Sequence, residues 1–179
     1  DRPVFHSLGA TDCKWFNVEG AYTVNLRNLI LDGTGKTFNA AIRYRNGATG
    51  IIENNIIRNI YSASSGAPFG VGVTTRSDIT VQNNTFQNIE RIGVSATITT
   101  TLGCLIKGNT FVGHGTAVEM CEYGVEVDFG GKATVEGNTI SGYTGVATDG
   151  SDSAGIYVSS YYYSTYSHLT TDELMEKVA

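Results

Sequence analysis

Apolar and polar residues alternate along the chain in short segments. Each segment leads into a polar corner of asparagine or glycine, and another apolar residue follows two places after the corner. The clearest copy is ITVQNNTFQN at residues 79–88. Further copies occupy residues 24–33, 50–59, 104–113 and 133–142. Aligned on the apolar residue before the corner, they are centred on Leu26, Ile52, Val81, Ile106 and Val135, at spacings of 26, 29, 25 and 29 residues. Alternation predicts β-strands, and a repeat of this length predicts a solenoid of stacked coils.

A second strand pattern lies between these copies and opens with a small residue followed by alternating large ones. It reads AIRY, GVGV, GVSA, GVEV and GIYV, starting at Ala41, Gly70, Gly93, Gly124 and Gly155. Because side chains alternate between the two faces of a strand, we expect two inward columns and one outward row. The expected columns are Ile42, Val71, Val94, Val125 and Ile156, and Tyr44, Val73, Ala96, Val127 and Val158. The expected outward row is Arg43, Gly72, Ser95, Glu126 and Tyr157.

The polar corner predicts a ladder of asparagine side chains. One slot is filled by Asn55, Asn84, Asn109 and Asn138, and the position before it is Asn or Gly. Both residue types tolerate a left-handed backbone. Amides in the same turn of successive coils can also hydrogen-bond along the stack, each bond contributing about 1 kcal/mol net. In the first copy Leu29 takes the slot, so we expect the ladder to start at Asn55.

Strands ending in Asn-Asn or Gly-Asn-Thr corners, alternating with Gly-led strands, resemble the right-handed parallel β-helix of the pectin-lyase-like superfamily. The resemblance covers residues 22–160 and concerns architecture rather than one family. It implies an all-β, right-handed, single-stranded parallel β-helix, for which the repeats predict about five to six coils. It also implies an outer strand face of the kind on which many members of the superfamily bind or cleave acidic polysaccharides.

The whole chain, residues 1–179, is interpreted as one β-helix domain that can be part of a longer protein. Residues 1–21, with the single Trp15, form an irregular N-terminal cap or first coil, and residues 22–160 form the coils. Residues 161–179 are a Tyr-rich tail in which the capping box Thr170–Glu173 predicts a short C-terminal helix. We expect this tail to cover the last coil, to mediate self-association or to contact a neighbouring domain.

The net charge argues against nucleic-acid binding, and the hydropathy argues against a membrane-spanning helix. The chain has 12 Lys and Arg against 17 Asp and Glu, a net charge of −5, and no basic stripe that would neutralise phosphates, so we expect no nucleic-acid binding. No apolar run approaches the ~20 residues of a membrane helix, so we expect no membrane span. Together with the resemblance, this favours an extracellular or cell-surface protein.

The three cysteines lack metal-site spacing, which argues against zinc. Cys104 occupies an inward strand position and is expected to be a buried small apolar residue. A Cys13–Cys121 disulfide remains open at this stage.

Candidate ligand-binding residues lie on the outward side of the Gly-led strands. They are Arg43, Arg45, Thr97, Glu126, Asp128 and Tyr157. Glu126 and Asp128 are two residues apart and therefore share a face, and paired carboxylates can act as acid and base or bind Ca²⁺. Ordinary solvated charge is the alternative, and no cofactor other than Ca²⁺ is suggested. Tyr157 and the tyrosines after it can stack on sugars or cover the last coil.

A weaker catalytic candidate is His114. Gly113-His114-Gly115 resembles the GHG tripeptide of polygalacturonase-type glycoside hydrolases, but the NTD, Asp-Asp and RIK motifs of that family are missing here. The context of the catalytic arginine of pectate lyases is missing as well. His114 then joins Glu126 and Asp128 as a weak catalytic candidate, with a simple turn residue as the alternative.

These patterns lead to two hypotheses of different class. The first is an extracellular module that recognises a polysaccharide on the outer face of the Gly-led strands, with lyase or hydrolase activity left open. The second is a non-enzymatic structural or adhesion module of a surface protein or fibre. Since fold alone does not specify function, the choice between them must come from the site.

Overall fold

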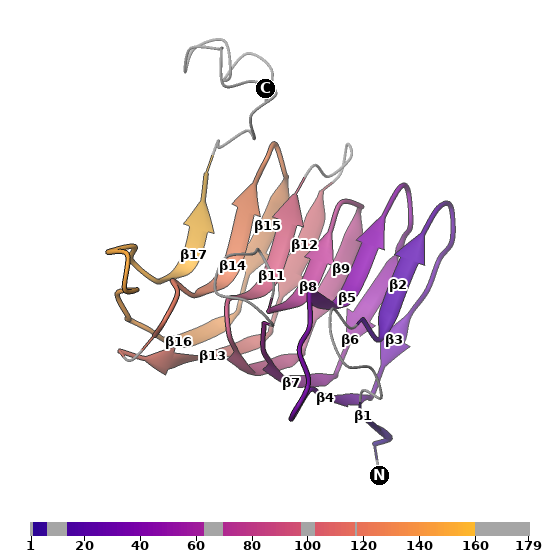
Figure 1. The fold of residues 1–179 in the computed structure, drawn as a ribbon. Coiled ribbons are helices and arrows are strands. Elements are labelled where there is room, and N and C mark those ends of the chain that lie inside the picture. Colours follow the sequence, from indigo (N-terminus) through magenta and orange to yellow (C-terminus); the bar gives the residue numbers. More distant parts are fainter. Residues whose placement is uncertain (1, 7–13, 63–69, 98–102, 117, 160–179) are drawn as a thin grey trace.

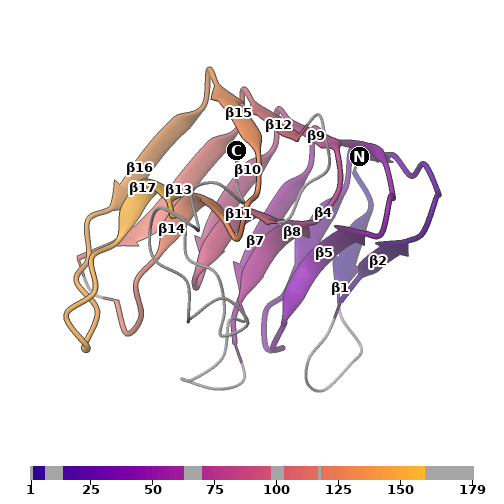
Figure 2. The same cartoon turned by 90° about the horizontal axis from the view of Figure 1, so that it is seen from above.

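The computed structural model describes residues 2–6, 14–62, 70–97, 103–116 and 118–159. In this part of the chain the strands form three sheets, and neighbouring strands within each sheet run parallel to each other. Figures 1 and 2 show the sheets wrapped around one axis, with the chain advancing from coil to coil. The predicted all-β parallel solenoid is confirmed, with about five coils.

Each sheet takes one strand from each coil. The Gly-led sheet contains β2 (Phe16–Glu19), β5 (Ala40–Arg45), β8 (Val71–Thr75), β11 (Ile92–Thr97), β14 (Tyr123–Asp128) and β17 (Ala154–Val158). The pre-corner sheet contains β3 (Leu26–Arg27), β6 (Gly50–Glu53), β9 (Ile79–Gln82), β12 (Cys104–Lys107) and β15 (Ala133–Glu136). The post-corner sheet contains β1 (Val4–His6), β4 (Ile30–Asp32), β7 (Ile56–Ile60), β10 (Thr85–Ile89), β13 (Thr110–Gly115) and β16 (Thr139–Tyr143).

The polar corner divides each repeat into two strands that belong to different sheets. Its first residue adopts a left-handed backbone in every coil, with φ of 59° at Asn28, 56° at Asn54, 55° at Asn83, 62° at Gly108 and 60° at Gly137. Asn and Gly reach this region at low cost, which explains why no other residue type occupies the position. The bend turns a ten-residue pattern that looks continuous in the sequence into a pre-corner and a post-corner strand.

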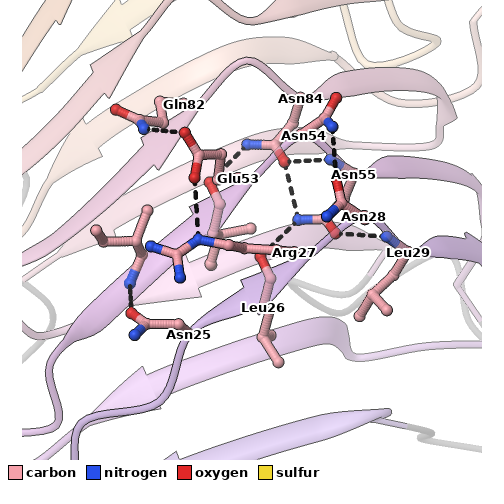
Figure 3. Close-up of polar contacts among 12 residues, drawn as sticks. Asn25, Leu26, Arg27, Asn28, Leu29, Glu53, Asn54, Asn55, Gln82 and Asn84 are labelled. Atoms are coloured by element: carbon pink, nitrogen blue, oxygen red, sulfur yellow. Dashed lines mark hydrogen bonds and ion pairs between the residues drawn. The ribbon is translucent and has the colours of Figure 1, made fainter.

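The predicted asparagine ladder is present at the second corner residue. Asn84 Nδ2 donates to the Ile52 carbonyl at 2.9 Å and to Asn109 Oδ1 at 3.0 Å, and Asn84 Oδ1 accepts from the Asn55 backbone N–H at 2.9 Å. The same pattern recurs from coil to coil. At the first coil, the Leu29 N–H donates to Asn55 Oδ1 at 2.9 Å, so the ladder starts at Asn55 as expected. Figure 3 shows this end of the ladder beside the ion pair of Arg27 and Glu53.

The register of the pre-corner sheet is the one that the sequence predicts. Leu26, Ile52, Val81, Ile106 and Val135 lie opposite one another on successive strands. Their side chains fill the solenoid, where Ile52, Val81 and Ile106 are fully buried. Burial of such a side chain contributes about 1.5–3 kcal/mol, so this column is a principal part of the core.

The expected register of the Gly-led sheet is wrong at one strand. On β8, Val73 rather than Val71 lies opposite Ile42 and Val94, and Thr74 rather than Gly72 lies between Arg43 and Ser95. Gly70-Val71-Gly72-Val73 contains two glycines that both fit the pattern, and a slip of two residues keeps every side chain on its face. The corrected repeat on this strand is therefore Gly72-Val73-Thr74-Thr75, and the outward row is Arg43, Thr74, Ser95, Glu126 and Tyr157.

Gly72 on β8 and Gly93 on β11 make room for two rings from the post-corner sheet. A Cβ at Gly72 would lie 3.1 Å from the ring of Phe86, and one at Gly93 would lie 2.7 Å from the ring of Phe111. These two rings are fully buried and stack at a centroid distance of 4.8 Å. Glycine is thus needed for close packing here, not for its backbone freedom.

Gly93→Ala is expected to destabilise the fold by about 1–3 kcal/mol, the usual cost of overpacking. The added methyl group would meet the Gly124 carbonyl at 2.6 Å as well as the Phe111 ring, so a shift of the ring alone cannot accommodate it. Urea unfolding followed by circular dichroism measures the effect. Gly35→Ala is the control for glycine removal, because nothing lies within 4 Å of a Cβ there and its cost comes from a φ of 73° alone. Equal stability of wild type and Gly93→Ala would refute the packing argument.

The N-terminal residues form part of the first coil. β1 pairs with β4 and β2 pairs with β5, so residues within 1–21 extend two of the sheets. Trp15 packs on Phe38 with ring centroids 4.4 Å apart, and it borders the core. The expected C-terminal helix and tail, residues 161–179, lie outside the described residues. In the part of the chain that the structure describes, no helix has the length and apolar character needed to cross a membrane.

Cys104 is buried, as predicted, and burial raises the pKa of its thiol to about 12. Cys121 is a free thiol. Cys13, the other half of the disulfide left open by the sequence, lies outside the described residues.

Candidate functional site

The outer face of the Gly-led sheet brings the predicted ligand-binding residues into two parallel rows. Ser95, Glu126 and Tyr157 lie opposite one another on β11, β14 and β17, and Thr97 lies opposite Asp128. Adjacent strands are about 4.8 Å apart, so these five side chains occupy one compact region. Figure 1 shows the three strands side by side at the C-terminal end of the sheet, from β11 to the yellow β17. We call this region the β14 face.

Glu126 and Asp128 form a carboxylate pair at the centre of the β14 face. Asp128 is 7% exposed, and burial together with the neighbouring charge of Glu126 raises its pKa to about 7. Burial also raises the pKa of Glu126, against the opposing influence of Arg91 and of a hydrogen bond from the Ser95 hydroxyl to Glu126 Oε2 at 3.4 Å. Two desolvated acids this close resist double ionisation. The pair is therefore different from ordinary solvated charge on an exposed strand.

The turn after Asp128 is strained. Phe129 has a φ of 47°, and among the described residues it is the one left-handed residue that is neither Gly nor Asn. Gly130 follows with a φ of 71°, and the Gly131 N–H closes the turn on the Asp128 carbonyl at 2.7 Å. A bulky residue in this region costs free energy and persists only where its surroundings hold it. The turn fixes the backbone directly beside the carboxylate pair.

Two tyrosine rings border the carboxylate pair. Tyr123 and Tyr157 stack with centroids 4.5 Å apart and planes 8° apart. Tyr157 is 39% exposed and Tyr123 is buried beneath it. Burial, reinforced by a hydrogen bond with Cys121, raises the pKa of the Tyr123 hydroxyl, so this ring stays neutral. The buried Tyr123 ring thus supports the Tyr157 ring, which remains accessible to solvent.

Arg43 and Arg45 lie on the same sheet but away from the carboxylate pair. Both are on β5, which is the third strand from β14 in the sheet order, so the two strands are about 14 Å apart. Arg43 Nε donates to Asn17 Oδ1 at 2.8 Å, and Arg45 Nη2 forms an ion pair with Glu19 at 2.6 Å. These arginines bind the neighbouring strand β2, so the predicted residues form an extended row with two ends rather than one cluster.

His114 is separate from the carboxylate pair. It lies at the end of β13 in the post-corner sheet, where its Nδ1 bonds Glu122 Oε1 and its backbone N–H donates to Glu122 Oε2 at 3.1 Å. Glu122 is buried, and its own backbone N–H donates to Ser153 Oγ at 3.0 Å. Glu122 thus holds His114 against the segment that leads into β14.

The His114–Glu122 contact predicts a pH-dependent stability. The hydrogen bond to Glu122 raises the pKa of His114 above its ordinary value of 6.5, with smaller contributions from the charges of Glu122 and Glu90 and against an opposing effect of burial. Stability from a raised histidine pKa is fully present below the unfolded value and is lost as the pH rises through the folded value. We expect the melting temperature of wild type to exceed that of His114→Gln most at about pH 5.5 and least at about pH 8.5. A difference that grows with pH would contradict the assignment.

Some residues of the β14 face are not evident from the sequence. Tyr123 precedes the Gly-led motif by one position and falls outside its alternation, so only the structure shows it beneath Tyr157. Arg76 and Arg91 lie in turns, and their charges act to lower the pKa of Asp128 and of Glu126, respectively. Turn residues carry no periodicity, which is why the strand pattern gives no signal for them.

Comparison with known proteins gives one match. A family model described as periplasmic copper-binding protein (NosD) matches residues 11–172. The family consists of right-handed β-helices within the pectin-lyase-like superfamily, which confirms the resemblance seen in the sequence. No curated protein and no solved structure matches the chain.

Proposed function

The chain belongs to the NosD family of β-helices, and from that premise we propose that this surface or periplasmic module binds a glycan on the β14 face. The observation that carries the proposal is the supported tyrosine ring beside the carboxylate pair. Aromatic rings offer sugars an apolar surface for stacking, and Tyr adds a hydroxyl. Carboxylates accept hydrogen bonds from hydroxyl groups, and charged hydrogen bonds are the stronger kind.

The shape of the sheet suits an extended ligand. The outward row continues from Tyr157 and Glu126 through Ser95 and Thr74 to Arg43, with one residue from each coil. A linear glycan lying along the solenoid axis would meet a new polar side chain about every 4.8 Å. The tyrosine end would supply stacking, and the remaining coils would supply hydrogen bonds.

Tyr157→Ala is expected to weaken glycan binding about tenfold or more, the equivalent of at least ~1.4 kcal/mol. Affinity gel electrophoresis against a panel of soluble polysaccharides measures the effect. Tyr22→Ala is the matched control, because Tyr22 is 68% exposed and lies far from β17 at the other end of the solenoid. Equal weakening by both substitutions, or by neither, would overturn the proposal. If no polysaccharide of the panel binds and the protein self-associates, the structural or adhesion hypothesis is favoured instead.

Copper, which the family description names, does not fit the residues that the structure describes. Copper sites draw on thiolate, thioether and imidazole ligands. The thiol of Cys104 is buried with a raised pKa, and His6 and His114 lie on β1 and β13, four strands apart in the post-corner sheet. Met120 and Cys121 are adjacent soft donors before β14, where Cys121 Sγ accepts from Arg91 Nη2 at 3.7 Å. Across the described ranges, no three His, Cys, Asp or Glu side chains gather to hold a metal ion. We therefore derive no function through copper; Cys13, His168 and Met175 lie outside the described residues.

A further inference from the structure

One oxygen atom on the β14 face lacks a hydrogen-bond partner among the residues that the structure describes. Asp128 Oδ1 is fully buried, and among the described residues it finds no hydrogen-bond partner. Asp128 as a whole is more than nine-tenths buried. Leaving a buried acceptor unpaired costs about 1–3 kcal/mol, and more when the group is charged. Such an atom is expected to have a ligand when the protein is in solution.

The surroundings of Asp128 Oδ1 consist of oxygen donors. Glu126 is two positions away on the same strand and points to the same side, and the two carboxylates influence each other's charge. Thr97 lies opposite Asp128 and is 8% exposed, and Ser95 contributes a hydroxyl at Glu126. Carboxylate, hydroxyl and water oxygens are the ligands that hard divalent cations prefer, whereas thioether and thiolate are absent from this set.

Two arginines on neighbouring elements act on the carboxylate pair. Arg76, after β8, and Arg91, before β11, are the cations that act on Asp128 and Glu126 respectively. Neither forms an ion pair with these acids within the described part of the chain. Among the described residues, Tyr123, its hydrogen-bond partner Cys121 and Tyr157 are further titratable groups on this face, and the raised pKa of Tyr123 keeps it neutral. Two acids therefore face two arginines that do not neutralise them by contact.

We propose that Asp128 and Glu126 bind a hard divalent cation of the Ca²⁺ class on the β14 face, with Asp128 Oδ1 as the principal ligand. Two carboxylates do not complete the six to eight oxygen ligands that Ca²⁺ takes, so water and neighbouring hydroxyls supply the rest. Sites with this few charged ligands are weak, with Kd on the order of 10⁻⁴–10⁻³ M. The proposal is independent of glycan binding and assigns the chain a different class of metal from the one in its family's description.

Isothermal titration of the metal-free full chain with CaCl₂, and Tb³⁺ luminescence excited through tyrosine, test the proposal. We expect one saturable site for wild type. Asp128→Asn should weaken it at least tenfold, and Glu126→Gln should weaken it as well. Asp149→Asn is the matched control, because Asp149 lies in an exposed loop and bonds the Ser151 N–H at 2.9 Å. Both Asn substitutions keep the side-chain shape, and circular dichroism confirms that the variants fold.

Three results would overturn the proposal. The first is no Ca²⁺ or Tb³⁺ binding by wild type at tenfold the weakest expected Kd. The second is equal weakening by Asp128→Asn and Asp149→Asn, which would indicate diffuse attraction to an acidic protein. The third is stoichiometric binding of Cu²⁺ that Asp128→Asn abolishes while Ca²⁺ fails to compete. Tyr157→Ala separates this proposal from glycan binding, because it should leave the cation site within about twofold of wild type and reduce glycan retardation alone.

Discussion

Asn84→Ala is expected to lower the free energy of unfolding by about 3–5 kcal/mol. Asn84 is 1% exposed and takes part in four side-chain hydrogen bonds with the coils on both sides. Alanine would leave the Ile52 carbonyl without its amide donor and the Asn55 backbone N–H without its acceptor. Each buried unpaired group costs about 1–3 kcal/mol. Since domains are stable by about 5–15 kcal/mol, the variant should be close to unfolding at ambient temperature.

The control for Asn84→Ala is the same substitution at the end of the ladder. Asn138 makes equivalent bonds to Ile106 and Asn109, but it is partly exposed, so water can replace the lost amide. We expect Asn138→Ala to cost about half as much as Asn84→Ala in urea titrations. Asn83→Gly is a second control, since glycine already occupies this left-handed position at Gly108 and Gly137. Equal costs at Asn84 and Asn138 would show that the ladder does not depend on burial.

The fold was predictable because the same pattern of apolar residues and polar corner recurs in every coil. Leu26, Ile52, Val81, Ile106 and Val135 could be aligned from the sequence, since each stands at a fixed distance before an Asn or Gly corner. Where the local signal was ambiguous, the prediction slipped: Gly70 and Gly72 both fit the start of a strand, and only Gly72 packs on a ring. The third sheet was not predicted because each Asn or Gly corner was interpreted as part of one strand pattern, whereas the strands before and after it belong to different sheets.

The site was predictable only for residues on strands. Glu126, Asp128, Thr97 and Tyr157 share a face because a period of two places them there, and the structure agrees. The burial of Asp128 and the stacking of Tyr123 depend on how separate coils meet, and one strand's pattern contains no information about that. His114 was a weak catalytic candidate from its glycine neighbours, and its partner Glu122, eight residues later, was not predicted because an irregular segment separates the two. Contacts made through loops have no fixed spacing, so sequence reasoning could not pair them.

Phe86→Ala should destabilise the fold by about 3–5 kcal/mol, the range measured when a large buried aromatic side chain is truncated. Phe86 is fully buried in the middle of a column formed by Phe5, Leu31, Ile57, Phe86, Phe111 and Ile140. The Phe86 ring fills the space that Gly72 leaves, so Phe86→Ala removes the contacts of this ring with both Phe111 and Gly72. No neighbour can refill the space, because coils on both sides are fixed by parallel sheet pairing.

The column itself provides the matched control, because Phe5 occupies the same register position on β1, the first strand of the described sheet. Phe5 is 39% exposed, so Phe5→Ala removes far less buried area and should cost about 1 kcal/mol. A double-mutant cycle of Phe86→Ala and Phe111→Ala isolates the ring–ring contribution, expected at about 0.5–1.5 kcal/mol. If Phe86→Ala cost no more than Phe5→Ala, the interior coils would not carry the stability of the solenoid. The open ends would then matter as much as the middle, contrary to a fold in which each coil is held by its two neighbours.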